Sequence, residues 1–373
     1  MIKLLNLKPD SFSLDISDFS LRVAQLKKRG KDLVLASFGE TNIKPGIIKK
    51  GEIRQEKDLV EAIQKTILQV EGEKIKTKYV VCSLPEEKAF LQVIKMPKMS
   101  EEDLKSAIVY EAENHIPLPI ENVYLDFQIV SSNPNSPQME VLIAALPKKT
   151  VDSYTDSLKK AGLKPFALEV ESLAIARALI EKEFVEKPIL LIDLGFTRTG
   201  FVVFSDSSVE FTSSIQVSSH DFTQIIAKAL HLEEKAAENL KIKYGLEGKI
   251  NFKIKGDKTE KKIERGRVFE ALIPALTDLV QQIRKYLDYY QNHISTNKEE
   301  VMEKVLLCGG GANLKGLAEL LSVELKIPVE LGNPLINISS RSGKTMPHLS
   351  LEKSLSYTTA IGLALRGMKE TKI

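Results

Sequence analysis

The residues best suited to chemistry lie in a short turn between two apolar runs. Residues 189–204 read ILLIDLGFTRTGFVVF, and this composition predicts a buried strand–turn–strand unit. Within the turn, the backbone of Gly195 can approach an anion closely, and the hydroxyls of Thr197 and Thr199 can donate to phosphate oxygens. Asp193 can hold a hydrated Mg²⁺. Because Asp-x-Gly turns are common in ordinary hairpins, the turn alone also fits a purely structural role.

An earlier stretch repeats this layout. Residues 11–26 read SFSLDISDFSLRVAQL, with Asp15 after the first apolar run and Ser17, Asp18 and Ser20 in the turn. Two such hairpins facing each other could hold one polyphosphate from both sides.

A third stretch is rich in glycine. Residues 305–317 read VLLCGGGANLKGL, which predicts a strand, then Gly309, Gly310 and Gly311, then a helix with Asn313 near its start. The glycines let the backbone pass close to a planar group or a phosphate, and a helix N-terminus favours negative charge. The spacing fits neither a P-loop nor a dinucleotide fingerprint. A structural tight turn is the alternative interpretation.

Composition bounds the class of protein. A chain of 373 residues, 43% hydrophobic and 28% charged, is typical of a soluble protein with two lobes or four smaller subdomains. The net charge of +3 does not indicate a nucleic-acid partner. Cys82 and Cys308 lie in apolar runs, as reduced core cysteines of a cytoplasmic protein do. No run reaches the roughly 18 apolar residues of a spanning helix, so we expect no direct membrane insertion.

The segments between these turns predict the elements that position them. Residues 86–164 predict a strand–helix–strand–strand–helix block, whose first helix is capped by Ser100, and this block is a candidate inserted subdomain. Further on, Asp221 is the predicted cap of a helix that runs to residue 230. On the next helix, Glu238 and Lys241 are three residues apart and share a face, as an ordinary solvated ion pair also would. A final helix is predicted over residues 354–366.

In this order the segments resemble the actin-like ATPase superfamily, and within it the PilM family of type IV pilus assembly proteins. The stretches that carry the resemblance are VIKMPKMSEEDLKSAIVYEAENHIPLP, KKAGLKPFALEVESLAIARAL, AAENLKIKYG and LLCGGGANLKGLAELLSVEL. The resemblance covers nearly the whole chain. It implies an α/β, actin-like (ribonuclease H-like) two-lobed fold with an inserted α+β subdomain in the first lobe. The implied parts are a first-lobe core (1–85, 165–188 and 354–373), the insertion (86–164), a second-lobe core (189–222 and 303–353) and a second-lobe cap (223–302).

The resemblance also implies an ATP and Mg²⁺ site. Its residues match the first phosphate loop (Asp15, Ser17, Ser20), the second phosphate loop (Asp193, Gly195, Thr197, Thr199), the nucleoside flank (Glu238, Lys241) and the adenosine loop (Gly309, Gly310, Gly311, Asn313). Asp15 and Asp193 would hold the metal. Glu171 falls where a water-positioning residue is expected, with Glu169 as a close competitor. Glu171 also fits a simple role as an acid at a helix N-terminus.

Two departures from the family bear on catalysis. The first loop reads Asp15-Ile16-Ser17-Asp18 where the family has Asp-Ile-Gly-Ser, so a glycine is lost and a like charge is added. Asp18 must either help to hold Mg²⁺ or point away from the phosphates. Phe196 stands where a small residue is usual. We therefore predict ATP binding with slow hydrolysis at most, and the sequence leaves open whether ATP is hydrolysed or only bound.

The resemblance implies a place in the cell and a set of partners. The chain would lie in the cytoplasm, held at the inner membrane through the cytoplasmic N-terminal peptide of PilN, and through PilN be linked to PilO. Pilus motor ATPases are further expected partners. The alternatives are an FtsA-like division or filament protein, a small-molecule kinase of the sugar-kinase branch and a nucleotide-independent scaffold. The tail GMKETKI lacks an apolar face, which argues against an FtsA-like protein. No acid is clearly committed to a substrate, which argues against a small-molecule kinase.

Overall fold

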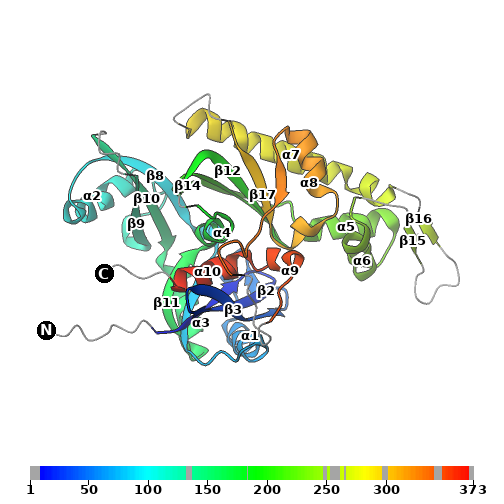
Figure 1. Cartoon of the computed structure of the whole chain (residues 1–373), viewed down its shortest axis with the longest axis horizontal. Coiled ribbons are helices and arrows are strands. Elements are labelled where there is room, and N and C mark those ends of the chain that lie inside the picture. Colours follow the sequence, from blue (N-terminus) through cyan, green and yellow to red (C-terminus); the bar gives the residue numbers. More distant parts are fainter. Residues whose placement is uncertain are drawn as a thin grey trace. The chain divides into compact units, whose positions relative to one another are not determined.

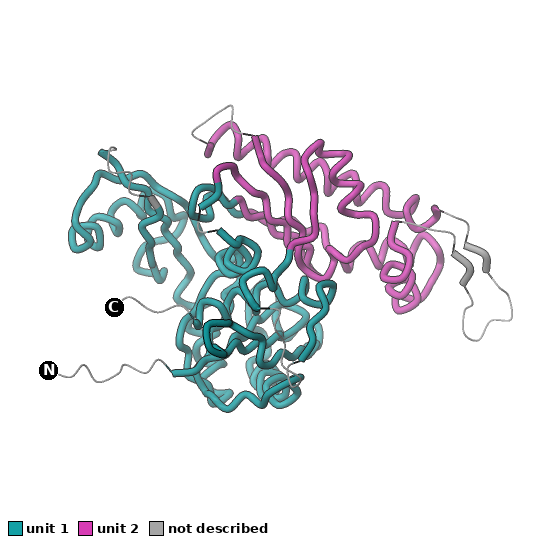
Figure 2. The backbone as a smooth tube through the Cα atoms, viewed as in Figure 1, with its two compact units in different colours: residues 1–185, 204–212, 333–373 teal, residues 186–203, 213–332 magenta. Residues whose placement is uncertain are grey.

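The chain forms two compact units, shown in different colours in Figure 2. The computed structural model describes residues 9–131, 137–182, 184–246, 250–252, 261–263, 266–295, 301–339 and 347–368. Unit 1 comprises residues 1–185, 204–212 and 333–373, and unit 2 comprises residues 186–203 and 213–332. The sequence also predicts a loop over residues 131–138 and an irregular basic segment over residues 249–267, and both lie largely outside the described residues. The finer division into subdomains stays a prediction.

A six-stranded sheet forms the centre of unit 1 (Figure 1). Its order is β11-β7-β1-β2-β3-β6, and the strands are β1 (Ser11–Ile16), β2 (Ser20–Arg29), β3 (Asp32–Asn42), β6 (Glu71–Gly72), β7 (Tyr79–Leu84) and β11 (Lys164–Val170). β1 pairs antiparallel with β2 and parallel with β7, and β7 pairs parallel with β11. The carboxyl ends of β1, β7 and β11 therefore meet at one edge of this sheet.

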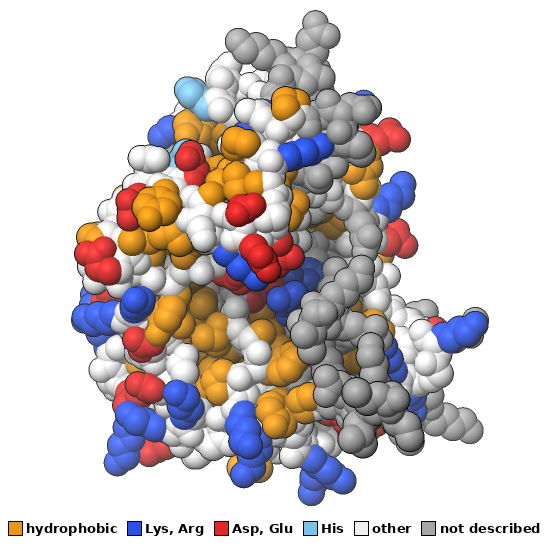
Figure 3. Space-filling model, turned by 90° about the vertical axis from the view of Figure 1, so that its left-hand side faces the viewer, with side chains coloured by type: hydrophobic (Ala, Val, Ile, Leu, Met, Phe, Trp, Pro, Cys, Tyr) orange, Lys and Arg blue, Asp and Glu red, His pale blue; other side chains and the backbone are white. Residues whose placement is uncertain are grey.

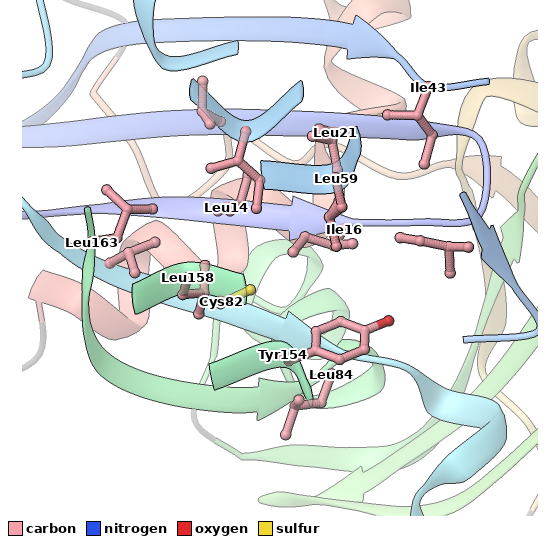
Figure 4. Packing of buried hydrophobic residues seen from close by; sticks show 14 of the residues in the cluster. Leu14, Ile16, Leu21, Ile43, Leu59, Cys82, Leu84, Tyr154, Leu158 and Leu163 are labelled. Atoms are coloured by element: carbon pink, nitrogen blue, oxygen red, sulfur yellow. The ribbon is translucent and has the colours of Figure 1, made fainter. Parts of the chain in front are cut away.

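Two helices cover this sheet and close its main core. α1 (Glu56–Leu68) and α3 (Lys148–Lys160) contribute Leu59, Tyr154 and Leu158 to a cluster with Leu14, Leu21 and Cys82, which Figure 4 shows. The predicted insertion includes α3, but this helix packs on the six-stranded sheet. Burial of these side chains drives the formation of unit 1.

The segment between β7 and α3 has a hydrophobic core of its own. β8 (Phe90–Pro97), β9 (Val123–Ser131) and β10 (Gln138–Pro147) form a three-stranded sheet covered by α2 (Glu101–Glu113). Leu104 and Ile108 of α2 pack on Val141 and Ile143 of β10 in this core. Ser100 caps α2 by accepting the amide of Asp103, as the sequence predicts. A separate core is what an inserted subdomain requires.

The second sheet repeats the strand order of the first. Its order is β14-β13-β12-β17-β18, and the strands are β12 (Val185–Leu194), β13 (Thr199–Asp206), β14 (Ser208–Ile215), β17 (Lys304–Cys308) and β18 (Val329–Leu331). When the two strand orders are aligned, β12 corresponds to β1 and β17 corresponds to β7. β17 pairs parallel with β12, as β7 does with β1. The two buried free cysteines, Cys82 and Cys308, lie in these corresponding strands β7 and β17.

Helices complete unit 2. They are α5 (Ser219–Leu230), α6 (Glu234–Tyr244), α7 (Arg267–His293) and α8 (Leu317–Leu325). α7 buries Leu272, Leu276, Leu279 and Ile283, a spacing that places one apolar face toward the core. A short β-ribbon, β15 (Ile250–Phe252) and β16 (Lys261–Ile263), lies between α6 and α7 in the chain. Among the described residues, no helix is long and apolar enough to cross a membrane.

Three expected helix boundaries were wrong. Ser218, not Asp221, caps α5: the Ser218 Oγ accepts the Asp221 amide. The glycine run leads into a 3₁₀ turn, Gly310–Asn313, and α8 begins only at Leu317, because Gly316 adopts a left-handed conformation with a φ of 81°. The last helix is divided into α9 (Leu351–Leu355) and α10 (Thr358–Met368), with a turn at Ser356 and Tyr357.

α10 packs closely on α4 (Glu171–Leu179), the helix that follows β11. A Cβ atom at Gly362 would overlap the Ala174 carbonyl oxygen of α4 and lie 2.5 Å from its carbonyl carbon. The Arg177 guanidinium also donates to the Gly362 carbonyl at 3.2 Å. The backbones of the two helices therefore touch at Gly362.

Replacing this glycine tests the contact. We expect Gly362→Ala to lower the free energy of unfolding by about 3 kcal/mol or more, because backbone atoms cannot move aside as a side chain can. Urea unfolding followed by circular dichroism measures the change. Gly200→Ala is the control, since its new Cβ would meet only the Asp193 Cβ, at 3.9 Å. Equal unfolding midpoints for the two variants would contradict this account of the packing.

Candidate functional site

The first predicted phosphate loop is a tight turn closed by its own hydroxyls. The Ser17 amide donates to the Ser20 carbonyl at 3.0 Å, and the Ser17 hydroxyl donates to the same carbonyl at 2.9 Å. The Ser20 amide donates to the Ser17 Oγ at 3.1 Å. Asp15 is buried near the end of β1, directly before this turn. The Ser17 hydroxyl thus donates its hydrogen bond within the turn.

Asp18 is held by a neighbouring hairpin. Its two carboxylate oxygens accept the amides of Lys50 at 2.6 Å and Gly51 at 3.0 Å, in the turn between β4 (Ile48–Lys49) and β5 (Glu52–Ile53). Both turn residues have positive φ, 51° and 70°, so their amides point the same way. Asp18 was expected either to help to hold Mg²⁺ or to point away from the phosphates. In the structure its carboxylate is directed at the hairpin of β4 and β5.

Glu171 is the first residue of α4 and is buried, at the edge of the sheet where β1, β7 and β11 end. Glu169, the other candidate for the water-positioning role, makes a bidentate ion pair with Arg177, with N–O distances of 2.5 and 2.6 Å. Burial, and next to it the charge of Glu171, raises the pKa of the Tyr154 hydroxyl well above its usual value. Glu169 is therefore committed to a structural pair, and Glu171 remains the candidate.

The second predicted phosphate loop is tied to the start of α5. The Gly195 amide donates to the Arg198 carbonyl at 2.9 Å, and the Gly195 carbonyl accepts the Ser219 amide at 3.0 Å. The Phe196 ring stacks on the His220 ring with centroids 4.6 Å apart. The bulky Phe196 is thus accommodated by α5.

The two threonines of this loop differ. Thr197 is exposed, whereas Thr199 is buried and its hydroxyl donates to the Val217 carbonyl at 2.6 Å. The phosphate-binding role of Thr199 stays a prediction. In this structure the Thr199 hydroxyl donates its hydrogen bond to a backbone carbonyl.

Lys241 joins α6 to α5. Its Nζ lies 2.7 Å from the Ser219 carbonyl, 2.9 Å from the Ser219 Oγ, 2.7 Å from the Thr223 Oγ1 and 2.8 Å from the Glu238 carboxylate. The Thr223 hydroxyl donates to the same carboxylate. Burial lowers the pKa of Lys241, and the bond to Glu238 opposes this shift only in part. The pair is therefore not the solvated surface pair that the sequence also allowed.

The glycine run lies against the end of β12. Asp193 pairs with Cys308 in the parallel register of β12 and β17, so the chain leaves both strands at the same edge. A Cβ atom at Gly309 would overlap the Asp193 Oδ1 and lie 2.6 Å from the Leu194 carbonyl, and the Gly309 φ is 81°. A Cβ at Gly311 would lie 2.5 Å from the Leu194 Cγ. Both glycines are needed by the fold itself.

Gly310 differs from its two neighbours. It is exposed and its φ is not positive, and the Asn313 side-chain amide donates to its carbonyl at 3.4 Å. Within unit 2 the structure thus brings the Asp193 loop, the glycine run and α5 with α6 into one group. Asp15, Ser17, Ser20 and Glu171 belong to unit 1.

Groups at this strand edge of unit 2 suit a phosphorylated ligand; Thr197 and Gly310 are exposed, and Asp193 is half-buried. Thr197 offers a hydroxyl, the 3₁₀ turn at Gly310 offers open backbone, and Asp193 offers a carboxylate for a hydrated metal ion. The described residues contain no cluster of three or more His, Cys, Asp or Glu side chains suited to a metal. Ligands of parallel-stranded sheets bind outside the carboxyl ends of the strands, which is where these groups lie.

Sequence reasoning missed three kinds of residue. Ser218 was missed as the cap of α5, although a serine three residues before Asp221 is a capping pattern that can be recognised locally. Ser219 and Thr223 bind Lys241 across 22 and 18 residues of sequence, and Glu86 binds the Ser172 amide across 86 residues. The sequence carries no local signal for these long-range contacts.

Comparisons with known proteins identify the family and the fold. A family model described as type IV pilus assembly protein PilM matches residues 13–368. A solved structure described as a PilM–PilN type IV pilus biogenesis complex is 26% identical with a TM-score of 0.77, and the match covers 97% of this chain and 100% of that one.

More distant relatives include the cell division protein FtsA of Pseudomonas aeruginosa, 24% identical over 57% of this chain and 50% of the relative. The chain spans about half the length of the curated relatives it matches. MreB5 of Spiroplasma citri bound to ADP is 14% identical with a TM-score of 0.58, and the match covers 94% of each chain.

These likenesses define an actin-like fold. The chain belongs to the PilM family of type IV pilus assembly proteins.

The contact at Gly309 yields a prediction. We expect Gly309→Ala to lower the free energy of unfolding by about 2 kcal/mol or more, because the new methyl group overlaps Asp193 and the left-handed φ is unfavourable for alanine. Gly310→Ala, at an exposed position without a positive φ, should stay within about 0.5 kcal/mol of the wild type. Thermal unfolding of both variants checks this. Similar losses in both would show that the contact with Asp193 is not what requires glycine.

Proposed function

We propose that the chain is an ATP-binding, actin-like component of type IV pilus assembly that binds the cytoplasmic N-terminal segment of PilN. The observation that carries this proposal is the match to a PilM–PilN complex over 97% of this chain and 100% of that one. In this role the chain lies in the cytoplasm at the inner membrane, and PilN connects it to PilO. Pilus motor ATPases are further proposed partners.

ATP is the proposed ligand and Mg²⁺ the proposed metal ion. Asp15 and Asp193 would hold the hydrated metal, and the backbone around Gly195 and Gly310 would face phosphate and adenosine groups. The placement of Lys241 supports a ligand role, because it is buried and bonds to Ser219, whose amide donates to the Gly195 carbonyl of the second loop. When bound, ATP supplies a phosphoanhydride bond that water can cleave.

Hydrolysis is proposed to be slow. The hydroxyl of Ser17 donates within its own turn, and that of Thr199 donates to the Val217 carbonyl. Neither proton is then directed at a developing phosphate charge, which is where phosphoryl transfer gains most of its acceleration. Glu171 is the residue proposed to orient water.

Calorimetric titration tests the nucleotide site. We expect ATP with Mg²⁺ to bind the wild-type chain, and Asp193→Ala to weaken binding at least about tenfold because the metal loses a carboxylate ligand. Asp58→Ala, at an exposed position in the first turn of α1, is the control and should bind as the wild type does.

Two outcomes would count against this part of the proposal. No binding to the folded wild-type chain would favour a nucleotide-independent scaffold, in which protein contacts carry the whole function. Turnover well above about one ATP per second in the isolated chain would contradict slow hydrolysis, since that rate is within the ordinary enzyme range.

The partner segment is proposed to lie extended between the insertion and the sheet of unit 1. On one face of the molecule, Figure 3 shows hydrophobic side chains exposed among acidic and basic ones. Tyr124 of β9 is 47% exposed, and its hydroxyl donates to Asp152 of α3 at 3.0 Å. Because α3 packs on the six-stranded sheet, Tyr124 joins the three-stranded sheet of β8, β9 and β10 to a helix that covers the larger sheet.

A binding assay with the peptide tests this. A fluorescent peptide of the PilN N-terminus should bind the chain, and Tyr124→Ala should weaken binding about tenfold by removing aromatic contact area. Tyr110→Ala, a more exposed tyrosine on α2, is the matched control and should have little effect. If a scrambled peptide binds equally well, the proposed partner is wrong. If only Tyr110→Ala weakens binding, the proposed location is wrong.

A further inference from the structure

Glu86 is a buried carboxylate at the carboxyl end of β7. It begins the 3₁₀ turn Glu86–Lys88 after Pro85, and only 9% of it is exposed. β8, which follows, belongs to the three-stranded sheet of the insertion, so Glu86 lies where the chain passes from one sheet to the other. Burying a carboxylate is costly unless its oxygens are well bonded, which requires an explanation here.

The carboxylate of Glu86 binds the start of α4. Leu84 of β7 pairs with Val170 of β11 in parallel register, so Glu86 and Ser172 each lie two residues beyond paired positions. The Glu86 Oε2 accepts the Ser172 amide at 3.2 Å. Val170, the N-cap residue of α4, makes no side-chain cap, so Glu86, in the turn after the neighbouring strand β7, supplies the acceptor that the first turn of α4 lacks.

This hydrogen bond is the only one that the Glu86 side chain makes within the described residues. The Glu86 Oε1 is buried and has no hydrogen-bond partner there, and neither has the Ser172 Oγ. A carboxylate with one oxygen unsatisfied is a poor choice for stability alone, because a better-satisfied or apolar side chain would cost less. The one hydrogen bond that it makes within the described residues is with the amide next to Glu171.

We propose that Glu86 is a positioning residue for Glu171: by holding the peptide group between Glu171 and Ser172, it fixes the direction in which the Glu171 side chain leaves α4. This inference rests on the proposed function, in which Glu171 orients the attacking water. In that reaction the water oxygen bonds to the γ-phosphorus, the bond to the β–γ bridging oxygen breaks, ADP leaves with the electron pair, and one water proton passes to solvent. Glu86 itself touches none of the reacting atoms.

Two measurements on the full chain test the inference. Hydrogen–deuterium exchange at the start of α4, without nucleotide, reports the contact to the Ser172 amide. Steady-state ATP hydrolysis reports its consequence for Glu171. We expect Glu86→Ala to speed exchange there and to lower kcat about tenfold while KM for ATP changes less than about twofold, because nucleotide binding is untouched.

Conservative and control variants separate positioning from folding. Glu86→Gln keeps an acceptor for the Ser172 amide and should restore both exchange protection and most of kcat. Glu87→Ala, in the same turn, should resemble the wild type. Glu86→Ala combined with Glu171→Gln should be no slower than Glu171→Gln alone, because Glu86 acts through Glu171.

The outcomes distinguish this inference from the proposed function. Unchanged exchange in Glu86→Ala, or measurable wild-type turnover that Glu86→Ala leaves unchanged, would overturn the positioning role while the proposed function stands. Failure of Glu86→Gln to restore kcat would do the same. A wild-type chain without any turnover would overturn the hydrolytic role of Glu171 itself, and Glu86 would then be a helix cap only.

Discussion

The candidate site of unit 2 depends on one steric constraint, the close approach of the glycine run to the end of β12. Gly309 and Gly311 lie so close to Asp193 and Leu194 that neither position has room for a Cβ atom. The parallel register of β12 and β17 creates this approach, because both strands end at the same edge of the sheet. Gly309 and Gly311 are therefore required by the fold, and of the three glycines only Gly310 is exposed.

The same edge exists in unit 1, and there it carries acids in place of glycines. β1, β7 and β11 are parallel neighbours, and their carboxyl ends carry the Asp15 turn, Glu86 and Glu171. Strand order is shared between the two sheets, so the glycine run and Glu86 follow corresponding strands. Two corresponding strands thus end differently: β7 is followed by the buried acid Glu86, and β17 is followed by the glycine run.

Local patterns predicted most elements, and long-range contacts explain what they missed. Apolar periodicity identified both hairpins and the strands and helices of the insertion, because the burial that drives them is visible within a short window. The direction of Asp18 could not be predicted, because its partners Lys50 and Gly51 lie 32 and 33 residues away. The burial of Lys241 was missed for the same reason. The helix expected at Asn313 failed because a single left-handed glycine, Gly316, delays the start of α8.

The path of the chain through Pro85 and Glu86 connects two features that the sequence presents as separate. β7 ends in the central sheet, and the chain enters the insertion within a few residues of the bond that Glu86 makes to α4. A displacement of the insertion next to Glu86 therefore acts on the strand end that holds the start of α4. Because an interior bond of this kind has few alternative arrangements, a small shift of the insertion either keeps or breaks it. In the proposed function, where the partner segment lies against the insertion, this hydrogen bond would connect the bound segment to the start of α4 and so to Glu171.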